Sequence, residues 1–136
     1  MAKESGLGWT TCSVDDSSGT LRAIINDVTN MEFATPRGVQ ETTGIDKSAI
    51  ERLLLLADFS CTLNGVFNDA ASTGAHTVLK TAGSFTGNRT VTQVVSGQTL
   101  TNECILTDFA MTRAASGELT WSAPLVLSDG TVPTWT

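Results

Sequence analysis

The sequence predicts a mainly β domain with a helix packed against a sheet. Threonine is abundant, at 22 residues, tyrosine is absent, and 12 glycines interrupt the chain. Threonine and valine favour strands, and glycine favours the turns between them. Residues 43–69 also change hydrophobic period halfway along, which indicates a helix that runs directly into a strand.

Length and composition restrict the class of protein. The chain has 136 residues and forms a single domain, residues 1–136, on this prediction. Its three cysteines show no ligand spacing, which indicates small buried side chains in a reducing compartment. No stretch resembles a signal peptide or a membrane span, so we expect a protein made and kept in a cytosol. The formal charge of -6 is scattered singly, which argues against a phosphate-binding patch.

The N-terminal part predicts a flexible arm followed by two strands. Residues 1–8 are small, polar and broken by glycine, as a mobile arm would be. Strands are expected over residues 9–14 and 21–26, separated by a turn. Residues 30–43 are either two strand ends joined by a long hairpin loop or one extended loop, with the tip near Pro36.

An amphipathic helix is expected over the first half of residues 43–69. Asp46 caps its start, or Ser48 does so in a capping box with Glu51. Its apolar stripe has i, i+3, i+4, i+7 spacing and consists of Ile50, Leu53, Leu54 and Ala57.

A strand with one apolar and one polar face follows the helix, because the period changes to two. Its apolar positions are Phe59, Cys61, Leu63 and Phe67. Its polar positions are Ser60, Thr62, Asn64 and Asn68.

The C-terminal half predicts a short helix and several strands. Residues 72–82 are a helix candidate, capped by Ser72 or Thr73 and stopped by Gly83. Residues 89–95 are β-branched, and a hairpin turns at residues 116–117. Pro124 in its second arm argues for an edge strand or a bulge. The combined patterns predict a core of Ile50, Leu53, Leu54, Phe59, Cys61, Leu63, Phe67, Phe109, Leu119 and Trp121.

The sequence offers no catalytic residues, metal ligands or cofactor site, so we expect no enzyme. His76 is the only histidine, and a lone histidine on a short apolar helix is more often structural than catalytic. Asp15 and Asp16 match no calcium loop, and a solvated turn explains them. Gly6 and Gly8 precede a strand, so they do not form a phosphate-binding loop.

Three stretches together resemble the major tail (tail tube) proteins of long-tailed siphophages, notably those of actinobacterial hosts. They are ETTGIDKSAIERLLLLADFSCTLNGVFND, the following AHTVLKTA and the closing GELTWSAPLVLSDGTVPTW. The resemblance covers about residue 20 to the end, and the helix entry followed by a strand ending in FND is its most specific part. It implies a β-sandwich of two packed sheets with a flanking helix.

The resemblance also implies how the chain assembles. Six copies form a ring in which the inner sheets join into one barrel, and stacked rings form a tube in the virion tail through which DNA passes. Assembly takes place in the host cytoplasm, and the implied partners are the chain itself and tape measure, tail terminator and tail tip proteins. No membrane and no sequence-specific DNA binding are implied.

Two surfaces of such a tube can be assigned to residues. A polar wall without free cations suits the passage of DNA, which places Ser60, Thr62, Asn64 and Asp108 at the lumen. The alternative is that the helix covers this face and the other face lines the channel. Apolar residues without a periodic pattern occur in residues 1–8, 30–43 and 130–136, so we expect these segments to be mobile until neighbouring subunits order them. The candidate contacts between subunits or rings are Met31, Phe33, Pro36, Arg37 and Trp135.

Other functions are compatible with the same patterns. A head-tail connector or tail terminator could share the fold. A monomeric β-sandwich that binds a ligand such as a carbohydrate would have the same alternation, although its aromatic residues would form a row on one face.

Overall fold

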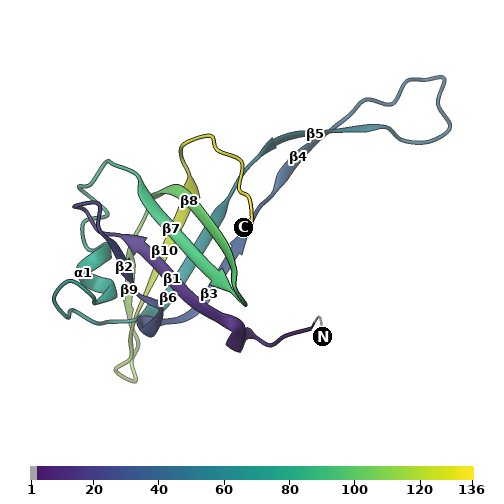
Figure 1. Ribbon diagram of the computed structural model, residues 1–136. Helices are drawn as coiled ribbons and strands as arrows, with labels where there is room; N and C mark the ends of the chain where they lie inside the picture. The colour runs from purple at the N-terminus through teal and green to yellow at the C-terminus, as the bar shows by residue number, and fades with distance from the viewer. Residues whose placement is uncertain (1–2) are drawn as a thin grey trace.

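The computed structural model describes residues 3–136 and is mainly β, as predicted (Figure 1). It contains one large antiparallel sheet, a separate two-stranded sheet and a short helix. The large sheet consists of β1 (Trp9–Asp15), β2 (Leu21–Ala23), β3 (Val28–Ala34), β6 (Ser60–Val66), β7 (Arg89–Val95), β8 (Gln98–Leu106), β9 (Ala110–Arg113) and β10 (Leu119–Leu127). The small sheet is a hairpin of β4 (Arg37–Glu41) and β5 (Arg52–Ala57). The helices are α1 (Ala75–Leu79) and two 3-10 turns, η1 (Gly6–Gly8) and η2 (Ile25–Asp27).

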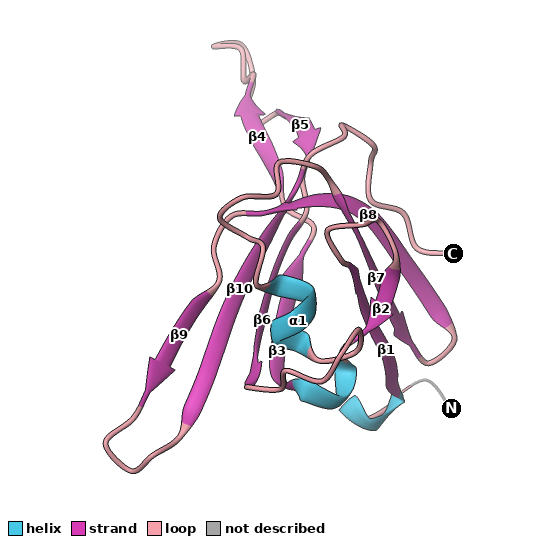
Figure 2. Cartoon of the chain, turned by 90° about the vertical axis from the view of Figure 1, so that its left-hand side faces the viewer, coloured by secondary structure: helices cyan, strands magenta, loops and turns pink. Residues whose placement is uncertain are grey.

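The large sheet curls so that its two halves face each other. Its strand order is β2-β1-β7-β8-β10-β6-β3, and β9 pairs with the projecting end of β10. Trp9 of β1 meets Phe33 of β3 with 5.2 Å between ring centroids, although these strands lie near opposite edges of the sheet. Figure 2 shows α1 beside the two halves. The arrangement gives a core between two β layers.

The alternation predicted for β6 is present. Phe59, Cys61 and Leu63 are buried, and Thr62 between them is exposed. Trp121 of β10 is buried opposite Gly65 of β6. Four of the ten residues expected in the core are therefore buried.

The prediction of a helix in the first half of residues 43–69 is wrong. These residues form the loop and second strand of the β4–β5 hairpin, which projects from the body (Figure 1). Ile50, Leu53 and Leu54, expected in the core, are 57%, 57% and 63% exposed. Four consecutive leucines satisfy the spacing of a helix and of a strand alike, and β5 pairs along β4 from Arg52 to Ala57.

The helix of the fold is α1, within the predicted residues 72–82. Its N-cap is Gly74 and not Ser72 or Thr73, and Ser72 has a positive φ of 68°. Ala75, Val78 and Leu79 are buried in the core. Within residues 3–136, no helix has the length and apolar character needed to cross a membrane.

Two more residues that were expected in the core, Leu119 and Phe67, are exposed at the ends of strands. Leu119 and Phe67 are each 38% exposed, because β9–β10 extends beyond the body and Phe67 follows the end of β6. Phe109 is partly buried against the core.

Pro124 lies in a central strand and not at an edge. It sits where the partner of β10 changes from β9 to β8, so its missing N–H breaks no ladder.

Residues 30–43 contain strand ends and no long loop. Met31 and Phe33 alternate with exposed residues on β3, which pairs with β6, and both pack against the core. The chain then turns at Pro36 into β4. A periodic pattern thus accounts for two residues that we had assigned to a loop between subunits. Of the arm at residues 1–8, residues 1–2 lie outside the described part and Gly6–Gly8 form η1.

The C-terminal tail lies against β8. Trp135 forms an isolated antiparallel β-bridge with Leu100, and Thr136 exchanges two backbone hydrogen bonds of 2.9 Å with Thr99. The Trp135 ring also lies 5.7 Å from that of Phe33. On this edge of β8, β10 pairs only with Cys104–Leu106. The tail occupies the remaining part of the edge.

The three cysteines are free and buried, and their chemistry can be tested. Burial raises the pKa of Cys12 to about 11 and those of Cys61 and Cys104 to about 12. Because the thiolate is the reactive form, we expect maleimide to label none of them in the native protein at pH 8 and all three in denaturant. Rapid labelling of a thiol under native conditions, followed by mass spectrometry, would contradict the packing described here.

Candidate functional site, an apolar hairpin and a polar sheet face

The β4–β5 hairpin presents apolar side chains on both of its faces. Val39 pairs with Leu54, so these two share one face, and a β-bulge in β5 follows between Leu54 and Ala57. Leu53 and Leu55 occupy the opposite face, where Leu55 lies against Gly38. The four leucines are between 43% and 89% exposed, and within residues 3–136 β4 and β5 pair only with each other. An isolated two-stranded hairpin in water is marginally stable, and an exposed apolar surface of this kind is typical of a protein interface.

Polar bonds at both ends hold the hairpin in register. At the base, Arg37 donates to the Leu55 carbonyl through Nε and Nη2, and the Asp58 amide donates to the Pro36 carbonyl at 2.9 Å. Near the tip, the Glu51 amide donates to Thr43 Oγ1 at 2.9 Å. Pro36 and Arg37, two candidate contact residues, therefore lie at the base, and both are exposed.

The hairpin is neutral on an acidic chain. Residues 37–57 contain three basic and three acidic residues, whereas the chain carries a net charge of -6. Arg52 pairs across the strands with Glu41, and Lys47 lies 3.9 Å from both Asp46 and Glu51. The acidic excess is thus confined to the rest of the chain.

The face of the large sheet that points away from the core is rich in hydroxyl and amide groups. Ser60, Thr62 and Asn64 lie on it, as the alternation predicts, and the opposite face of β6 is buried with α1. Cross-strand register places these further residues beside them: Asn30, Glu32, Thr112, Thr120 and Ser122. Asp108 is exposed in the loop between β8 and β9 and accepts a bond from the Phe109 amide, so it is not on the strand face.

The cations of the large sheet lie off this polar face. Arg22 is opposite the buried Val14, Arg89 is itself buried, and Arg113 is opposite Leu119. Glu32 and Glu103 alternate with Phe33 and Cys104 and therefore point to the polar face. Within the described strands, this face thus carries neutral polar groups and carboxylates, together with the apolar Val66, Pro124 and Val126.

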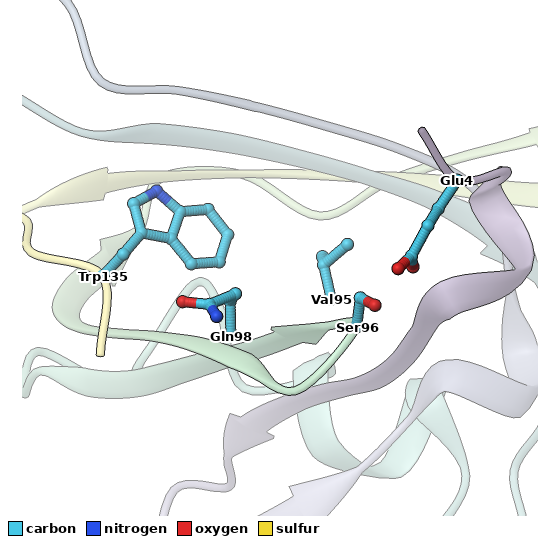
Figure 3. A pocket seen from close by; sticks show the side chains of 5 residues that line it. All are labelled: Glu4, Val95, Ser96, Gln98 and Trp135. Atoms are coloured by element: carbon cyan, nitrogen blue, oxygen red, sulfur yellow. The ribbon is translucent and has the colours of Figure 1, made fainter. Parts of the chain in front are cut away.

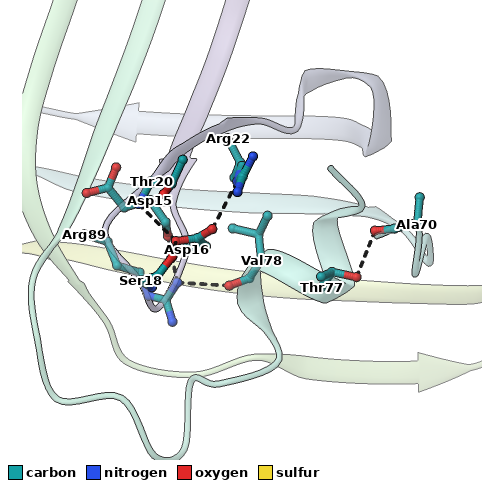
Figure 4. Close-up of polar contacts among 9 residues, drawn as sticks. All are labelled: Asp15, Asp16, Ser18, Thr20, Arg22, Ala70, Thr77, Val78 and Arg89. Atoms are coloured by element: carbon teal, nitrogen blue, oxygen red, sulfur yellow. Dashed lines mark hydrogen bonds and ion pairs between the residues drawn. The ribbon is translucent and has the colours of Figure 1, made fainter. Parts of the chain in front are cut away.

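Buried polar residues attach α1 and its loops to the body. Arg89 is 1% exposed, and its Nη1 donates to the carbonyls of Asp15 at 2.8 Å and Val78 at 3.0 Å (Figure 4). Burial lowers the pKa of its guanidinium. Asp27 is also buried, and its carboxylate accepts the Ala75 amide at 3.0 Å, which caps α1 in place of a local side chain. These contacts fix α1 and indicate no reaction.

The turn at residues 15–19 is closed by a carboxylate. Asp16 accepts from the Ser18 hydroxyl at 2.7 Å and from the Thr20 amide and Arg22 Nε at 3.0 Å (Figure 4). These donors, with Ser18 first, hold the pKa of Asp16 well below its usual range. No three His, Cys, Asp or Glu side chains within residues 3–136 are placed to hold a metal ion.

The hollows of the surface contain few groups with catalytic potential. One of about 460 Å³ lies between the N-terminal segment and the tail, where Glu4 and Trp135 stand on either side of the β7–β8 turn (Figure 3). His76 packs between the rings of Phe67 and Phe109, with centroids 4.6 and 5.7 Å away, and its Nδ1 has no hydrogen-bond partner. We find no arrangement of a nucleophile and a base around either feature in the described residues.

The curled sheet, flanking helix and projecting hairpin define a known fold. No family model matches the sequence, and no curated protein does so. Among solved structures, the chain is similar to one in the virion of a native gene transfer agent particle, with a TM-score of 0.76 and 12% identity over 98% of this chain and 99% of the other. It is also similar to a chain in the tail of an empty gene transfer agent particle refined with C6 symmetry, with a TM-score of 0.75 and 15% identity over the same shares. At these identities the likeness shows the shared fold.

Proposed function

We propose that the chain is a structural protein of a phage-like tail, which assembles with copies of itself into stacked hexameric rings that form a tail tube. The observation that carries this proposal is the β4–β5 hairpin, whose leucines are exposed on both faces and whose strands pair only with each other within residues 3–136. An apolar surface of this kind indicates a protein interface. The C6 symmetry of a tail structure with the same fold supports a sixfold ring of this chain. The resemblance of the sequence to siphophage tail tube proteins agrees with this proposal.

Two ribbons at opposite ends of the molecule are suited to contact between rings. The β4–β5 hairpin projects from one end, and the β9–β10 ribbon projects from the opposite end (Figures 1 and 2). Phe67, Met111 and Leu119 are 38%, 42% and 38% exposed around this second end. Unlike surfaces at opposite ends make a head-to-tail contact, which extends without closing and so builds a filament.

In the tube, the polar sheet face lines the lumen. Ser60, Thr62 and Asn64 offer hydrogen-bonding groups to water, and the neighbouring Glu32 repels phosphates. The free edge of β3 is available to pair with a neighbouring subunit, because β3 pairs only with β6 in the part of the chain that the structure describes. The location that follows is the virion tail.

Electron microscopy tests the assembly directly. We expect the purified chain to form rings and long tubes of uniform width in negative stain. Rings that never stack would favour a terminator or connector, and a chain that stays monomeric at high concentration would contradict the proposal.

A paired substitution tests the lumen. We expect Asn64→Lys to fold and assemble but to slow the release of DNA from particles, most strongly at low salt, because the new cation faces no acidic partner. Thr62→Lys is the matched control, since residue 62 lies opposite Glu32 and the carboxylate compensates the charge. Equal release rates for Asn64→Lys and the unmodified chain at low salt would show that this face does not line the channel.

A further inference from the structure

Arg89 is a buried cation that forms no ion pair within residues 3–136. It is the only buried arginine of the chain, and the ion pairs of the described part join other residues. Burial lowers the pKa of its guanidinium, and the carboxylates of Asp16 and Asp15 raise it without a hydrogen bond to it. The Asp16 carboxylate is already paired with Arg22. Because buried charges in proteins are usually paired, an anionic group from outside the chain would suit this position.

Two of the five N–H donors of Arg89 have no acceptor in the described chain. Nη1 donates to the carbonyls of Asp15 and Val78, and Nη2 donates to the Thr81 hydroxyl at 2.9 Å. These three bonds leave the Nε hydrogen and one Nη2 hydrogen free. The Phe85 ring covers one face of the guanidinium, with the Arg89 Cζ atom 5.0 Å from the ring centroid. An acceptor that approaches in the plane of the guanidinium is not obstructed by this ring.

A hollow of about 290 Å³ lies beside Arg89, between the loop that follows α1 and the end of β8. This volume is close to the lower limit for small-molecule sites, which is about 300 Å³. Apart from Thr86 and Arg89 the lining is apolar, and Phe85 and Leu106 belong to it. Gly87 lets the loop approach the Phe85 ring, because a Cβ at residue 87 would lie 2.6 Å from Cζ of that ring. The hollow therefore combines apolar walls with a single cation.

We propose that this hollow binds a carboxylate group on a short apolar stem. One guanidinium balances one negative charge, and its two free N–H groups match the two oxygens of a carboxylate. A phosphate carries more negative charge at neutral pH than one arginine balances. The carboxylate belongs to a free organic acid or to an acidic side chain of another protein chain, and the two share the same chemistry. Binding at this site does not depend on the proposed assembly.

Titration of the purified chain with sodium butyrate tests the site. We expect the NMR signal of the Arg89 Nε–H group, identified by its slow exchange with solvent, to shift and saturate with a dissociation constant on the order of 1 mM. Butyramide is the neutral control of the same shape and should bind about tenfold more weakly or less. The absence of a saturable shift, equal binding of the two compounds, or tighter binding of inorganic phosphate than of butyrate would overturn the proposal.

Two glycine variants of the loop locate the ligand without removing Arg89. Gly87→Ala displaces the Phe85 ring and changes no hydrogen bond of the guanidinium, so we expect butyrate to bind about fivefold more weakly or less. Gly83→Ala is the matched control, because no atom lies within 4 Å of a Cβ at residue 83, and it should bind butyrate like the unmodified chain. Full affinity in Gly87→Ala would show that butyrate lies elsewhere and would overturn the site.

N-acetylglutamate amide distinguishes the two sources of the carboxylate. This compound presents the group on a side chain attached to a peptide backbone, and N-acetylglutamine amide is its neutral control. Binding of the glutamate compound and not of the glutamine compound would support the site and assign it to an acidic side chain of another chain. Binding of butyrate alone would support the site and assign it to a free organic acid.

Discussion

Replacing residues 38–56 by an Asn-Gly turn is expected to give a chain that folds normally and forms no tubes. The excised strands pair only with each other, and none of their leucines belongs to the core. Arg37 and Ala57 already pair across the base, and the Asp58 amide bonds to the Pro36 carbonyl, so a short type I′ turn can close the cut. Circular dichroism and thermal melting report the fold, and negative-stain microscopy reports assembly.

A control variant keeps the hairpin and its leucines and changes only polar side chains. Glu41→Gln with Lys47→Gln changes polar groups of the hairpin, keeps its length and leaves its net charge at zero, so it should assemble like the unmodified chain. Tubes formed by the excised chain would show that the hairpin has no part in assembly. Unfolding of the excised chain would show instead that the hairpin supports the body, against the contacts described above.

Gly65→Ala is expected to reduce the stability of the fold strongly. A Cβ at this position would overlap the backbone carbonyl of Asp27 and lie 2.7 Å from Cζ2 of the buried Trp121. Neither obstacle is the end of a flexible side chain, so strand β6 would have to shift. We expect a loss of about 3 kcal/mol or more in the free energy of unfolding, or a fall in Tm of roughly 10 °C.

Gly83→Ala is the matched control for this effect. No atom lies within 4 Å of a Cβ built at Gly83, and its φ is not positive. We expect a change within about 0.5 kcal/mol in urea unfolding. If both variants melted alike, the close packing of η2, β6 and Trp121 would be incorrect.

Features set by neighbouring residues were predictable from the sequence. Alternation along residues 59–64 identified the buried and polar faces of β6, and the turn at residues 116–117 identified the β9–β10 hairpin. Both depend on a local period and a local turn, which are visible without a partner. The short helix α1 was also found, because its turn and apolar residues lie within one segment.

Features set by distant residues or by other molecules were not predictable in the same way. The helix predicted in the first half of residues 43–69 depends on the assumption that the chain buries its own leucines, whereas the leucines of β5 are exposed. The cap of α1 comes from Asp27, which is 48 residues from Ala75 and carries no local signal. The arginines of the large sheet lie off the polar face. This placement depends on strand register, which the spacing of residues in the sequence does not define.

The separate pairing of β4 with β5 makes the hairpin a local unfolding unit. Because its hydrogen bonds belong to no other strand, it can open without disturbing the body, and its amides should exchange with deuterium far faster than those of β6 or β7 in the free subunit. Part of the free energy of docking is then spent in ordering the hairpin, which weakens each single contact and leaves a misplaced subunit free to dissociate. In the proposed assembly, a tube built from many such contacts combines correction of errors during growth with permanence once the hairpin is docked.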